Sequence, residues 1–84
     1  MTTQVQNLTD SVYMTSSKIY AGWKVEVYTP ENHNRKVYEV HEFMHEVPGS
    51  TIVGIVNSER AANEIVEKRR VEVLASDEYR QARV

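Results

Sequence analysis

The chain has 84 residues, with ten basic and twelve acidic side chains and no cysteine. This length supports one small domain spanning residues 1–84, and the lack of cysteine excludes disulfides, thiolate metal sites and cysteine nucleophiles. A net charge of −2 does not indicate nucleic-acid binding, because proteins that bind nucleic acid usually carry clustered positive charge. No apolar run is long enough to span a bilayer, and the first residues lack the features of a signal peptide, so we expect a cytoplasmic protein without membrane contact.

The start of the chain predicts β-structure. Residues 1–10 are polar, and we expect them to be flexible or extended. Residues 11–20 carry β-branched and aromatic side chains. They favour either one strand or two short strands around Ser16 and Ser17.

The clearest strand signal is the stretch GWKVEVY at residues 22–28. Its apolar and mostly polar side chains alternate, which is typical of a strand with one buried face. Gly22 indicates a bulge or a turn at its start. Residues 29–34 then carry a proline and two asparagines, which favour a turn.

Residues 35–47 fit two structures. As a helix, they place most of their apolar side chains on one broad stripe, with a capping sequence before it and Pro48-Gly49 after it. As a strand, their Val-Tyr-x-Val sequence suits β-structure and could form a hairpin with residues 22–28. We predict a strand over residues 36–43, although the periodicity by itself favours the helix.

The second half of the chain predicts a buried strand followed by a helix. Residues 51–56, TIVGIV, are apolar and β-branched. Residues 57–70 have a helical apolar stripe, with Asn57 or Ser58 as the cap and the basic residues late in the helix.

The last segment leaves one alternative open. Residues 70–76 either extend this helix or form a short strand, and Ser76 followed by two acidic residues favours a final short helix. Strands first and helices last predict an α+β fold, in which an antiparallel sheet of three to four strands packs against a C-terminal helix. The other face of the sheet would be left for contact.

Residues 41–45 match the pattern His-Glu-x-x-His of zinc peptidases. In a helix His41 and His45 would share a face, and Glu64 or Glu67 could be tried as a third ligand. In a strand they would lie roughly 13 Å apart. We expect both histidines to be exposed on a solvated face and not to share a ligand, so we predict no metal and no cofactor.

A basic run is the first feature that could bind nucleic acid. Arg69 and Arg70 follow Lys68, and acidic residues flank the run. The simpler interpretation is a charged helix end that interacts with solvent and with the helix dipole.

Aromatic residues on the predicted sheet are the second such feature. If exposed, Tyr20, Tyr28 and Tyr38 could stack bases, but the ribonucleoprotein signature is absent. The same tyrosines could instead anchor a protein interface.

Hydrolase chemistry has little support, because the chain has no Gly-x-Ser-x-Gly elbow and no glycine-rich phosphate loop. The leading hypothesis is a non-enzymatic module that binds another protein, such as a host factor, or forms a homodimer through an edge strand. Small, cysteine-free chains of this type are common among phage and mobile-element accessory proteins, including inhibitors of host defence. The second hypothesis is a nucleic-acid-binding regulator, and the third is a minimal zinc peptidase.

Overall fold

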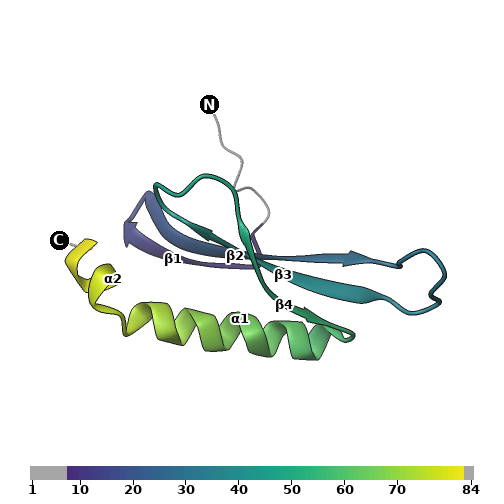
Figure 1. The fold of residues 1–84 in the computed structure, drawn as a ribbon. Helices are drawn as coiled ribbons and strands as arrows, with labels where there is room; N and C mark the ends of the chain where they lie inside the picture. The colour runs from purple at the N-terminus through teal and green to yellow at the C-terminus, as the bar shows by residue number, and fades with distance from the viewer. Residues whose placement is uncertain (1–7, 83–84) are drawn as a thin grey trace.

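The computed structural model describes residues 8–82 and shows an α+β fold, as the sequence predicts. Four antiparallel strands form one sheet in the order β1-β2-β3-β4, and a long helix lies across one face of it (Figure 1). The elements are β1 (Asp10–Thr15), β2 (Lys18–Tyr28), β3 (Val37–Met44), β4 (Thr51–Val56), α1 (Glu59–Leu74) and α2 (Asp77–Ala82).

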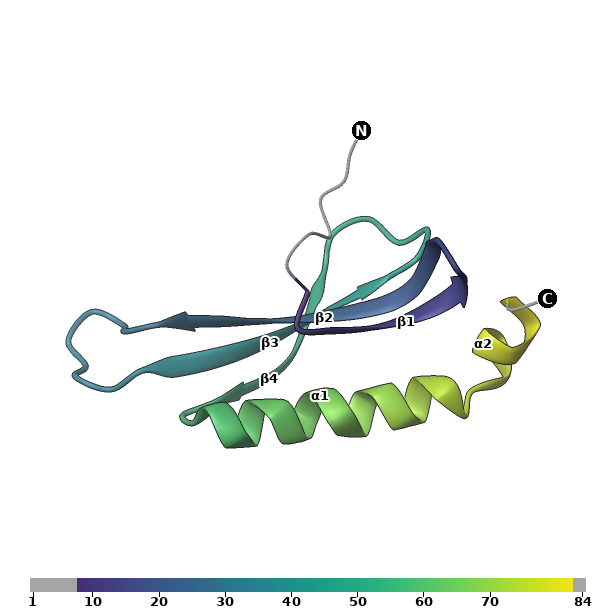
Figure 2. The same cartoon turned by 180° about the vertical axis from the view of Figure 1, so that it is seen from behind.

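The predicted strand within residues 35–47 is confirmed as β3. It pairs with β2 along its whole length, from Ala21 opposite Met44 to Tyr28 opposite Val37. The hairpin formed by β2 and β3 extends beyond the start of α1 (Figures 1 and 2), and the molecule measures 48 × 29 × 18 Å. The far end of this hairpin is therefore not covered by a helix.

Alternation along β2 decides which side chains meet the helix. Trp23 is fully buried and Val25 packs against the core, whereas Lys24 and Glu26 point to the other side. Residues that face one another across two antiparallel strands lie on the same side of the sheet. The fully buried Val40, opposite Val25, therefore also faces α1.

Ser58 begins α1 as one of the two predicted caps. Its Oγ accepts a hydrogen bond of 3.1 Å from the backbone N–H of Ala61. The helix continues to Leu74, so residues 70–76 extend it and the basic run lies before its last turn. Ser76 then caps α2, because its Oγ accepts from the backbone N–H of Tyr79 at 3.2 Å.

The core lies between α1, α2 and the covered face of the sheet. Burying a valine or a larger apolar side chain stabilises the fold by about 1.5–3 kcal/mol. The buried apolar residues are Val12, Tyr20, Ala21, Trp23, Val40, Ala62, Val66, Val73 and Tyr79.

Two details of the sequence prediction are wrong. β4 is an edge strand with exposed side chains and not a buried strand. The irregularity in β2 falls at Tyr20 and not at Gly22, because Val12 pairs with Ala21 and Tyr13 already pairs with Ile19.

Gly22 instead lies under the side chain of Leu8, where a Cβ would come within 2.5 Å of Leu8 Cδ1.

Ser16 and Ser17 form the turn between β1 and β2, so the two-strand alternative for residues 11–20 holds. Residues 1–7 of the segment expected to be flexible or extended lie outside the described residues, and Asp10 already belongs to β1. Among residues 8–82, no helix is long and apolar enough to cross a membrane.

Candidate functional site

The face of the sheet that α1 does not cover carries a connected group of polar side chains. The Tyr28 hydroxyl donates to Glu39 Oε2 at 2.7 Å, and His41 Nε2 lies 3.1 Å from Glu39 Oε1. Ser50 Oγ, in the loop after β3, lies 3.5 Å from His41 Nδ1. We call Tyr28, Glu39, His41 and Ser50 the polar line of the open face.

The register of the β2–β3 hairpin assembles this polar line. Glu39 and His41 are two residues apart on β3, so their side chains share a face. Tyr28 lies opposite Val37, which places its ring diagonally beside Glu39. Sequence positions 28 and 39 thus become neighbours through strand pairing.

Charge on the open face is mixed. Glu26 lies directly opposite Glu39, an arrangement of like charges that costs stability. Lys24 Nζ is 3.0 Å from Glu26 Oε2 and offsets this repulsion. The hydrogen bond and the charge of Lys24 lower the pKa of Glu26. The hydrogen bond to Glu39, followed by desolvation and the charge of Glu39, raises the pKa of the Tyr28 hydroxyl.

Two isoleucines of β4 flank the polar line. Glu39 is opposite Ile55, and His41 is opposite Ile52, so both isoleucines lie on the open face. Their exposed fractions, 61% for Ile55 and 48% for Ile52, are high for such large apolar side chains. Together with Tyr28, which is 43% exposed, they give this face an apolar component.

The order serine, histidine, glutamate along the polar line has the form of a nucleophile, a base and an orienting acid. The contact of 3.5 Å between Ser50 and His41 is, however, longer than the 2.6–3.2 Å expected between a nucleophile and its base. Ser50 is also exposed, on a loop. The histidine–glutamate contact is therefore the firmer of the two contacts in this line.

The His-Glu-x-x-His pattern does not form the helix that zinc peptidases require, because it lies at the end of β3 and in the following turn. His41 points to the open face, whereas Glu42 is buried on the covered face. The ring of His45 packs against Tyr20, with their centroids 4.8 Å apart. Within the described part of the chain, no group of three or more histidine, aspartate or glutamate side chains could hold a metal ion.

The expectation that both histidines are exposed is wrong. The His41 side chain is 20% exposed, and its ring contacts the Glu39 carboxylate. His45 is half-buried, and its Nδ1 is buried without a hydrogen-bond partner. Each ring is held by its own local contacts, on Glu39 and on Tyr20.

Glu42 connects the sheet to the helix. Arg69 donates two hydrogen bonds to it, from Nε to Oε1 at 2.7 Å and from Nη2 to Oε2 at 2.9 Å, and the indole N–H of Trp23 donates to Oε1 at 2.8 Å. Burial alone would raise the pKa of Glu42, but the hydrogen bonds and the charge of Arg69 outweigh it and lower the pKa. The hydrogen bond from Arg69 to Glu42 in turn raises the pKa of the guanidinium.

The predicted basic site is thus engaged within the protein. Arg69 also reaches Glu72 at 2.6 Å. Arg70 lies 2.9 Å from Glu67 and 3.4 Å from Asp10. The hydrogen bond and charge of Glu67 raise the pKa of Arg70.

The structure separates the three tyrosines that the sequence groups as binding candidates. Tyr28 lies on the open face and is exposed. Tyr38 is half-buried on the covered face. Tyr20 is only 5% exposed and packs against Tyr79 with ring centroids 5.1 Å apart, so Tyr20 does not meet the condition of exposure that its role as a binding candidate required.

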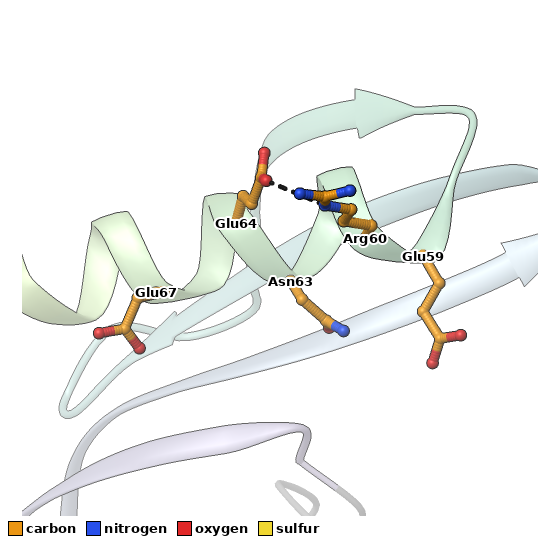
Figure 3. A pocket seen from close by; sticks show the side chains of 5 residues that line it. All are labelled: Glu59, Arg60, Asn63, Glu64 and Glu67. Atoms are coloured by element: carbon orange, nitrogen blue, oxygen red, sulfur yellow. Dashed lines mark ion pairs between the residues drawn. The ribbon is translucent and has the colours of Figure 1, made fainter.

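One hollow elsewhere on the molecule, drawn in Figure 3, is less suited to binding. It has a volume of about 590 Å³ and is lined by side chains of α1 alone, which spread along the helix in different directions. Arg60 and Glu64 in it form an exposed i,i+4 ion pair of 3.6 Å. This surface is a solvated helix face.

No protein-family model matches the chain, and no curated protein or solved structure matches it.

Sequence reasoning missed most of the open face. Tyr28 was identified, but Glu39, Ser50 and the two isoleucines of β4 were not. The usable signal was the alternation of β2 and β3, which assigns Glu39 and His41 to the side away from Trp23 once the two strands are paired.

Proposed function

We propose that this protein is a non-enzymatic module that binds another protein through the open face of its sheet. The observation that carries the proposal is the uncovered polar line of Tyr28, Glu39 and His41 beside the exposed Ile52 and Ile55. Polar groups held by hydrogen bonds and flanked by apolar side chains are the composition of a protein interface.

The chemistry of the face indicates what the partner should present. Glu26 and Glu39 offer carboxylates, and Lys24 is the neighbouring cation. The complementary surface therefore carries hydrogen-bond donors opposite the carboxylates and apolar side chains opposite Ile52 and Ile55. A nucleic-acid backbone is a poor match, because its phosphates would face these carboxylates.

The narrower form of the proposal is that the partner is a host protein that the module inhibits, as phage or mobile-element accessory proteins do. It rests on the type of chain: small, cysteine-free and without a catalytic motif. In that case binding should block the partner's activity at a fixed stoichiometry.

The experiment is affinity capture from the native host's lysate, followed by reconstitution of the complex from purified components. The test variants are Tyr28→Ala and Glu39→Lys, which remove the aromatic anchor or reverse the charge at the centre of the polar line. The matched control is Arg60→Ala with Glu64→Ala, on the exposed outer face of α1. Thermal unfolding of each variant establishes that it is folded.

We expect one protein to be recovered at fixed stoichiometry with the wild type and the control. Its affinity should fall by roughly tenfold or more in each test variant, since a central anchor contributes upwards of about 1.4 kcal/mol. A partner that binds all variants equally would refute the open face as the site. Recovery of nucleic acid without a dominant protein would support the regulator hypothesis instead.

A further inference from the structure

β4 is an unprotected strand edge. In the described sheet it pairs only with β3, and its sequence TIVGIV contains no charged residue and no proline. Proteins usually protect an exposed edge with charges, prolines or a covering element, because its free backbone groups can pair with another strand. Short uncharged β-branched segments are those that pair most readily.

A bulge in β4 determines what kind of strand would fit. Val40 pairs with Gly54 and His41 pairs with Ile52, so Val53 is the extra residue. As a result Ile52 and Ile55 share the open face although two residues separate them. In a regular strand, side chains on one face have a single residue between them.

We propose that β4 pairs antiparallel with β4 of a second copy of this chain, with Ile52 of one copy opposite Ile55 of the other. Both strands then have two residues between their isoleucines, so the register is kept across the bulge. If a regular strand paired with β4, the two strands would no longer present side chains on the same face beyond Val53. The bulge therefore disfavours ordinary partners and favours an identical strand.

This pairing has the two-fold symmetry of an isologous interface. It joins the two sheets into one sheet of eight strands, four from each copy. Four isoleucines, which are largely exposed in the single chain, meet at the two-fold axis on the open face. No charged side chain of β4 opposes the contact.

The oligomeric state of the full chain tests the proposal by sedimentation velocity and light scattering. We expect a dimer in the wild type. Ile55→Lys should weaken it roughly tenfold or more, because two ammonium groups would be placed in the interface. Val71→Lys is the matched control, since Val71 is a similarly exposed apolar residue, 52%, on α1, and it should leave the dimer intact.

The register is tested with single cysteines, which the natural chain lacks. Directly opposed residues have Cα atoms about 4.5–5.5 Å apart, within the range of a disulfide. A mixture of the Ile52→Cys and Ile55→Cys variants should therefore form a disulfide-linked heterodimer on oxidation. Ile52→Cys alone should not cross-link, because its two copies would lie about 10 Å apart, three residues along the pair.

A wild type that stays monomeric at several hundred micromolar would overturn the proposal, as would cross-linking of Ile52→Cys alone as efficient as that of the mixture. These results are separable from those for partner binding. Ile55→Lys reports on the dimer in the purified protein, whereas Tyr28 lies on β2, which β3 separates from the β4 edge, so Tyr28→Ala should leave the dimer unaffected.

Discussion

Arg69 on α1 and Glu42 on β3 form an ion pair with two hydrogen bonds, of 2.7 and 2.9 Å, and the indole of fully buried Trp23 donates to the same carboxylate at 2.8 Å. The Glu42 side chain is only 9% exposed, so its charge depends on these partners in place of water. The pair therefore links α1 to the covered face of the sheet, beside the buried Trp23.

Glu42→Ala should destabilise the fold by about 2–4 kcal/mol, because it leaves the guanidinium and the indole N–H without their shared acceptor. The measurement is the free energy of unfolding in urea. Glu72→Gln is the control: Glu72 is the more exposed partner of Arg69, with 47% of its side chain exposed, and its replacement should cost less than about 1 kcal/mol. Equal losses in the two variants would contradict the central role of Glu42.

Stability should also depend on pH through Glu42. The pKa of this carboxyl is lowered from its usual value of 4.5, so its contribution is complete above about pH 4.5 and is lost as the pH falls through the lower pKa of the folded state. Thermal unfolding of the wild type and Glu42→Gln between pH 7 and pH 2 should give curves that converge at low pH. A constant difference between them over that range would exclude the linkage.

Gly54 on β4 should tolerate no side chain without movement of Ile65 on α1. A Cβ at this position would lie 2.5 Å from Ile65 Cδ1. The clashing atom is the end of a side chain that can change rotamer, so we expect Gly54→Ala to cost only about 0.5–1.5 kcal/mol in the free energy of unfolding. Ile65→Val removes the clashing methyl group, so the cost of Gly54→Ala should be smaller in that background. Additive effects in the double-mutant cycle would rule out this contact as the cause.

Zinc should not bind at stoichiometric levels. His41 contacts the Glu39 carboxylate, and the ring of His45 packs against Tyr20. Glu42, the residue that would act as the base, accepts hydrogen bonds from Arg69. Elemental analysis of purified protein should give far less than one zinc per chain, with no difference in His41→Ala or His45→Ala. One bound zinc that both substitutions remove would prove this expectation wrong.

Local sequence features predicted several elements correctly. The alternation in residues 22–28 gave the central strand with Trp23 on the buried face. Ser58 and Ser76 marked the starts of the two helices, because a hydroxyl can accept the free backbone N–H groups of a first helical turn. These features depend only on residues close together in the chain.

The candidate site could not be predicted in the same way. The apolar spacing of residues 35–47 also fitted a helix, and pairing with β2 decided for a strand. Residues 51–56, expected to be a buried strand, come last in the strand order and so form an edge, and the extra residue Val53 places both isoleucines on the open face. Bulges and register depend on the neighbouring strand, which local patterns do not contain.

Arg69 shows the same division between sequence and tertiary structure. In the sequence it belongs to a basic run and resembles a solvent-facing residue. In the fold it points at the sheet, between the buried Val66 and Val73 of the same helix, where Glu42 from a distant strand binds it. Apart from residues 35–47, the sequence by itself determined the elements, the caps and the α+β class, because these follow from local periodicity and hydrogen bonding. Only the tertiary structure decided which charges are buried and which face stays open, because both depend on contacts between residues far apart in the chain.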